Sequence, residues 1–149
     1  MVKKSQIIFM EGKEKALDAL FGDENATFGY LAIGFQDTSG QNGFEDPLAV
    51  ENNSTPNGFM EIQQESYKRI KLEKVTDGVV RDPDSGKVLR KYQAVLENSN
   101  ITQSQDINQI AVVDNQNIDA ETTIYSATTF QTFNKTNESS ITFVIGFRI

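Results

Sequence analysis

Aspartates and glutamates are the main candidates for catalytic or metal-binding residues in this sequence. Asp37-Thr38-Ser39-Gly40 contains one carboxylate of the kind that aspartic proteases use. Those enzymes need two carboxylates that share a proton, and glycine directly follows their Asp-Thr or Asp-Ser pair. Here an extra serine intervenes and no second copy of the motif occurs. The segment therefore predicts a solvent-exposed loop.

Asp82, Asp84 and Gly86 have a spacing that could present oxygens to a calcium ion. A helix-loop-helix calcium site would need a bidentate glutamate at its twelfth position, and that position is Gln93. The same segment is typical of a β-hairpin turn, which is the interpretation we prefer. A second acidic loop is an equally weak cation candidate, with Asp37, Asn42, Glu45 and Asp46.

A glycosidase would place two carboxyl groups ~5–10 Å apart in a cleft, usually beside stacking aromatic rings. The sequence has no tryptophan. Its phenylalanines and tyrosines fall mostly at alternating positions of expected strands, which is typical of core residues. Aromatic patterning therefore favours packing over a sugar-binding cleft.

Histidine and cysteine are both absent. Their absence excludes Ser-His-Asp triads, Cys-His pairs and most structural zinc sites. Carboxylates, lysine, tyrosine, serine and threonine remain available for catalysis, so other catalytic chemistry is not excluded. We nevertheless expect a non-enzymatic protein with no catalytic residues, no metal and no cofactor.

The net charge of −7 argues against nucleic acid and against anionic membrane surfaces as partners. No apolar stretch approaches the ~18 residues of a membrane span. The two lysines near the N-terminus precede an apolar run that is too short for a signal peptide. We expect a protein that is made in a cytoplasm and is not processed.

The pattern near the N-terminus predicts one short helix, at about residues 9–21. It would end at Gly22, a residue type favoured in a left-handed C-terminal cap. We expect this helix to pack against the rest of the protein through one apolar stripe, formed by Phe9, Ala16, Leu17, Leu20 and Phe21.

The remainder predicts a single β domain over residues 1–149, either an antiparallel β-sandwich or a jelly-roll-like barrel. A central strand is expected at 26–35, and a strand with mixed faces is expected at 66–75, either near a sheet edge or under a neighbouring subunit. A hairpin should join 79–81 to 87–96, and further strands are expected at 107–113, 122–133 and 140–149. A long polar loop, at about 36–57, separates the first two strands; such loops often carry function.

This running order resembles that of small structural proteins of bacteriophage particles. The resemblance lies in four segments: Phe28–Gly34; Glu65, Tyr67, Arg69, Ile70 and Leu72; Ile107–Asp114; and Tyr125–Phe130 before the closing strand 141–149. It implies a virion location and partners among other virion proteins, including copies of the chain. It implies a capsid-bound accessory, decoration or head-fibre attachment role, or alternatively tail, collar or baseplate fibre attachment.

A few apolar residues in and after the polar loop are candidates for the assembly interface: Phe44, Pro47, Leu48, Val50, Phe59 and Met60. Something must cover them, either a partner or the chain's own domain. A carbohydrate-binding or adhesion module is the alternative from another class. It would need an exposed aromatic platform, for which the amphipathic candidates are Tyr30, Tyr67, Tyr92 and Tyr125.

Overall fold

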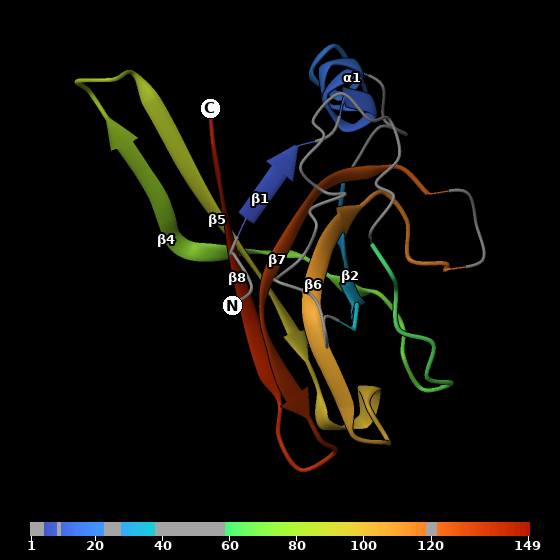
Figure 1. The fold of residues 1–149 in the computed structure, drawn as a ribbon. Helices are drawn as coiled ribbons and strands as arrows, with labels where there is room; N and C mark the ends of the chain where they lie inside the picture. Colours follow the sequence, from blue (N-terminus) through green and yellow to red (C-terminus); the bar gives the residue numbers. More distant parts are fainter. Residues whose placement is uncertain (1–4, 9, 23–27, 38–58, 119–121) are drawn as a thin grey trace.

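The computed structural model describes residues 5–8, 10–22, 28–37, 59–118 and 122–149. Two antiparallel sheets and one helix make up most of this part of the chain, which confirms the expected β-sandwich with a short N-terminal helix (Figure 1). The elements are β1 (Ser5–Ile8), α1 (Met10–Leu20), β2 (Tyr30–Gly34), β3 (Ile70–Lys71), β4 (Glu73–Asp82), β5 (Lys87–Leu96), a 3₁₀ turn (Asn98–Asn100), β6 (Gln105–Val113), β7 (Ile124–Lys135) and β8 (Ile141–Arg148).

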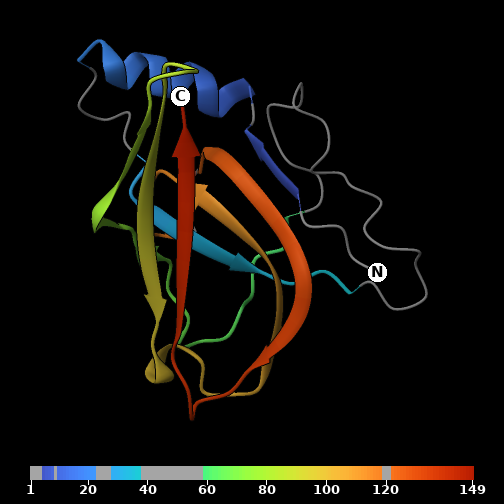
Figure 2. The same cartoon turned by 90° about the vertical axis from the view of Figure 1, so that its left-hand side faces the viewer.

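The larger sheet has five strands in the order β1-β7-β6-β2-β3, and the smaller sheet has three in the order β4-β5-β8. Figure 2 shows the smaller sheet in front of the larger one, with α1 across one end of the sandwich. The predicted strands at 107–113, 122–133 and 140–149 correspond to β6, β7 and β8. Strand β1 was not predicted, because four residues are too few to establish a period.

The core lies between the two sheets. Strand β2 is central, as predicted: it pairs with β3 and β6, and residues 31–34 are all buried. Its alternate side chains reach both faces of the sheet. The interlayer core contains Leu31, Ile33, Ile62, Tyr67, Ala94, Leu96, Ile101, Ile107, Ile110, Val112 and Ile145. A second buried cluster on the other face contains Ala32, Ala111, Val113 and Ala127.

The predicted strand at 66–75 is wrong as a single element. Residues 70–71 pair with β2 in the larger sheet, whereas the chain from Glu73 onward pairs with β5 in the smaller sheet. Leu72 lies at the crossing, where its N–H donates to the carbonyl of Gly29 at 2.8 Å. The mixed faces in the sequence arise because the segment changes sheets. Its expected position at an edge is correct, since β3 and β4 are both edge strands.

The predicted hairpin joins β4 to β5. Gly86 has φ of +69°, a left-handed conformation that suits glycine, and the Asp82 side chain accepts hydrogen bonds inside the turn. The pairing register shifts between Lys74 and Val79, where Asp77 has φ of +57°. Such an irregularity bends a strand, and the outer half of the hairpin projects as an arm (Figure 1).

The helix forms where expected and its cap is confirmed, since Gly22 has φ of +97°. The expected packing stripe is wrong for three of its large residues, and Phe9 lies outside the described residues. Leu17, Leu20 and Phe21 are 59, 74 and 85% exposed. The helix instead contacts β7 through Gly12, which is buried against the backbone of residues 124–125. Only a residue without a side chain allows this approach, so the side of the helix away from β7 points outward, with Leu17 and Leu20 beside the exposed Lys13 and Glu14.

Candidate assembly site

The densest polar cluster of the described chain surrounds Arg69. Its Nε and Nη2 donate to the two carboxylate oxygens of Glu61, both at 2.9 Å, in a bidentate pair. Its Nη1 donates to Thr122 Oγ1 at 2.8 Å and to the carbonyls of Asn115 and Asn117 at 3.2 Å. The guanidinium therefore fastens three segments of the chain together.

Tyr67 belongs to the same cluster. Its hydroxyl donates to Glu61 Oε2 at 2.6 Å and accepts from the backbone N–H of Ile33 at 2.9 Å. Burial, followed by the adjacent Glu61 carboxylate, raises the pKa of Tyr67 above the ordinary tyrosine range. The phenol thus stays protonated and serves as a structural donor. Each polar group here is engaged with the chain itself, which indicates a structural role for the cluster.

The Asp82 carboxylate, in the turn between β4 and β5, is hydrogen-bonded within that turn. Asp82 accepts from Ser85 Oγ at 2.7 Å and from the backbone N–H of Asp84 at 3.0 Å. The hydrogen bond from Ser85, followed by those from the backbone, lowers the pKa of Asp82. Within the described residues no three acidic side chains gather as a metal site would require. The proposed loop with Asn42, Glu45 and Asp46 lies outside the described residues.

Two of the six predicted interface residues, Phe59 and Met60, lie in the described part of the chain. Phe44, Pro47, Leu48 and Val50 lie outside it, as does most of the predicted loop at 36–57. Phe59 is half-buried against the outer cluster of Ala32, Ala111, Val113 and Ala127. Met60 is 57% exposed. Phe59 therefore contacts its own domain, while Met60 is available at the surface.

None of the four tyrosines forms an exposed platform. Tyr67 is only 3% exposed, and the other three are half-buried. Tyr125 packs between Phe28 and Phe147, with ring centroids 5.1 and 5.5 Å apart. These rings pack against one another in the space between the sheets.

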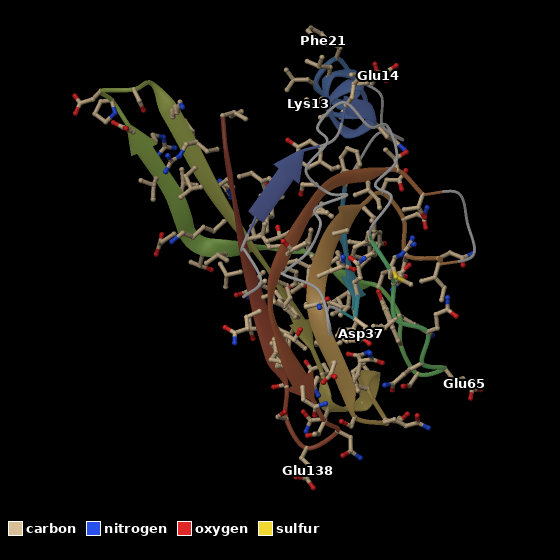
Figure 3. The ribbon with its side chains drawn as sticks, viewed as in Figure 1. Lys13, Glu14, Phe21, Asp37, Glu65 and Glu138 are labelled. Atoms are coloured by element: carbon tan, nitrogen blue, oxygen red, sulfur yellow. The ribbon has the colours of Figure 1, made fainter. Side chains whose placement is uncertain are left out.

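The end of the sandwich beneath α1 combines an exposed helix with an apolar cavity. Phe21 projects from the helix away from the sheets (Figure 3). Lys15 forms an ion pair with Asp114, which anchors the opposite side of the helix. A cavity of about 290 Å³ opens between the sheets at this end, lined by residues that include Ala16, Phe28, Tyr92, Tyr125, Phe147 and Ile149.

The free edge of β8 is the second candidate surface. Val88 and Ile149 exchange both backbone hydrogen bonds, at 2.8 and 3.0 Å. In an antiparallel ladder such reciprocal pairs alternate, so odd-numbered residues of β8 bond to β5. The intervening residues direct their N–H and C=O groups away from β5: Thr142, Val144, Gly146 and Arg148. Among the residues described, no strand pairs with this edge.

An apolar groove of about 470 Å³ runs beside that edge. Its floor includes Phe130 and Phe133 of β7, whose rings stack at 5.7 Å, and Phe143 of β8 lies 6.3 Å from Phe133. Sequence reasoning missed this site. A signal was present in 141–149, a regular apolar strand without proline and with one charge, but one sequence cannot show which strand lies at an edge.

Comparisons of the chain with protein-family models, curated proteins and solved structures found no match. Within the described part of the chain, no helix has the length and apolar character needed to cross a membrane.

Proposed function

We propose that this protein is a non-enzymatic structural component of a bacteriophage particle, bound to the capsid as an accessory, decoration or head-fibre attachment protein. Attachment of fibres at the tail, collar or baseplate is the alternative within the same class. Its partners are other virion proteins, including copies of itself, and its location is the virion. The sequence resemblance supplies the phage context, and the structure supplies a surface suited to assembly.

The outward apolar face of α1 is the observation that carries this proposal. Leu17 and Leu20 of α1, and Phe21 directly after it, are each more than half exposed. Exposed apolar patches of this kind often mark protein interfaces. A helix held to its own domain through Gly12 and Lys15 presents these side chains on a rigid support, so little ordering entropy opposes docking.

The polar clusters support a structural role as well. Glu61, Tyr67 and Arg69 bond to one another and to the backbone, and Asp82 is engaged by its own turn. These carboxylates stabilise the fold, and neither lies in one of the apolar cavities described above.

Reconstitution on particles tests the proposal. Phage particles assembled without this protein should bind the purified chain and carry it through sedimentation. The Leu17→Ser/Leu20→Ser variant should lose binding by about a hundredfold or more, because burying each leucine contributes about 1.5–3 kcal/mol. Its unfolding midpoint should change little, since both side chains are exposed in the free chain.

Ile118→Ser is the matched control. Ile118 is 41% exposed in the segment between β6 and β7, outside the patch of Leu17, Leu20 and Phe21, so this variant should bind particles like the unmodified chain. Particles that never retain the unmodified chain would contradict the phage role. Full binding by the double variant would instead show that another surface carries the attachment.

A further inference from the structure

The edge of β8 differs from the other described sheet edges in lacking protection. Natural proteins protect edges with short strands, bulges, charges or proline. Strand β3 has two residues and β1 has four. Strand β4 is bent by its irregularity after Lys74 and carries several charges. Strand β8 pairs with β5 over eight residues in one continuous register and has a single charged side chain, Arg148.

The larger sheet extends beyond β8. In Figure 2, β5 lies to the left of the red strand β8, whereas β7 and β1 lie behind it and to the right. The smaller sheet therefore ends before it covers the inner face of β7. The groove occupies this place, lined by Thr128, Phe130 and Phe133 on one side and by β8 on the other.

We propose that this groove accepts an extended segment of another polypeptide as a fourth strand of the smaller sheet. The backbone of the added strand would bond to Thr142, Val144, Gly146 and Arg148. Its inward side chains would lie against the rings of Phe130, Phe133 and Phe143. Strand addition of this kind obtains affinity from main-chain hydrogen bonds and specificity from pockets for alternate side chains.

The chemistry of the groove defines the occupant. Inward positions must be apolar, because they meet aromatic rings and threonine. Outward positions lie beside Thr142, Val144 and Arg148, which are exposed, so polar residues suit them. The partner is thus an uncharged or acidic segment of about seven residues, alternating apolar and polar, matching the span of free groups at ~3.4 Å per residue.

A folded second copy does not suit this position. Pairing two β8 edges would bring the overhanging β7 and β1 of one copy into the space of the other (Figure 2). Each described strand of the chain is also already paired within its own sheets, so none is free to be donated. A detached segment from a different protein fits without either conflict. This inference does not depend on the phage role.

Amide hydrogen exchange followed by NMR tests the proposal. In the free chain, the amides of Thr142, Val144, Gly146 and Arg148 should exchange faster than those of Phe143 and Ile145. The probe is a capped peptide of alternating threonine and valine, about nine residues long. At about 1 mM it should slow the four outward amides by about tenfold, while the same peptide with a central proline should not.

Two variants locate the binding. Val144→Pro removes one outward N–H without removing a bond to β5, and should abolish the protection. Val144→Lys keeps that N–H but adds an edge charge, and should weaken the protection given by the peptide. It tests the same edge in case the proline variant folds poorly. Thr76→Lys, at the exposed edge of β4, is the matched control and should bind normally.

Three results would overturn the proposal. One is strong protection of the outward amides in the free, dilute chain, which would mean that the edge is already occupied. Another is protection that rises with the concentration of the chain alone, which would identify a second copy as the occupant. The third is an unchanged exchange pattern with the alternating peptide.

Discussion

At the residue scale, Arg69 connects parts of the chain that are distant in sequence. Its side chain is 5% exposed, and it bonds to Glu61 and to the segment around residues 115–122. A buried guanidinium is tolerated only when its donors are satisfied. The planar fork of arginine matches the two oxygens of Glu61, a geometry that lysine cannot reproduce.

We expect Arg69→Ala to lower the free energy of unfolding by about 3–5 kcal/mol, because Glu61 would remain partly buried without its cation. Urea denaturation followed by circular dichroism measures this change. Arg81→Ala, at an exposed position on β4, is the control and should stay within about 0.5 kcal/mol of the unmodified chain. A loss below about 1 kcal/mol for Arg69→Ala would show that the cluster contributes little to stability.

At the scale of elements, the position of α1 depends on one close contact. A Cβ added at Gly12 would lie 2.5 Å from the Cα of Tyr125 and 2.9 Å from the carbonyl oxygen of Ile124. Backbone atoms cannot rotate away as a flexible side chain can. The sequence pattern of the helix therefore gave the wrong packing face, because its large residues occupy the side that Gly12 leaves outward.

Gly12→Ala should destabilise the protein by about 1–3 kcal/mol, the usual result of overpacking. In the middle of an ordinary helix, the same change would instead raise the free energy of unfolding by about 0.5–1 kcal/mol. The direction of the shift in a thermal melt thus distinguishes the two cases. Glu14→Ala, at an exposed position of α1, should change the melting temperature little. A stabilised Gly12→Ala variant would contradict the tight contact with β7.

At the scale of the whole molecule, the unequal widths of the two sheets determine how the protein can associate. Five strands face three, and the wider sheet overhangs the free edge of β8 (Figure 2). The overhang sterically blocks a second folded sandwich from pairing with this edge, but it leaves room for a single added strand. The exposed face of α1 lies at one end of the sandwich, so the two surfaces can be engaged separately.

The isolated chain should accordingly be a monomer of 16.6 kDa by light scattering behind a sizing column. Its net charge of −7 adds electrostatic repulsion between copies. A stable dimer that dissociates on Val144→Lys would show that β8 edges do pair and that the overhang is no obstacle. A dimer that dissociates only on Leu17→Ser/Leu20→Ser would assign self-association to α1.

Local sequence patterns were sufficient to predict the β-rich fold, the helix and its glycine cap, the turn at Asp82–Gly86, and most strand positions. These features depend on local periodicity and on residues with special backbone preferences. The sequence also excluded catalysis that requires histidine or cysteine.

Four features became apparent only from the packed fold: which strands form edges, where residues 66–75 change sheets, which face of α1 is buried, and how Glu61, Tyr67 and Arg69 meet. Each of these depends on contacts between segments far apart in the chain. Local patterns do not encode such contacts, and the groove beside β8 exists only because two sheets of unequal width are packed together.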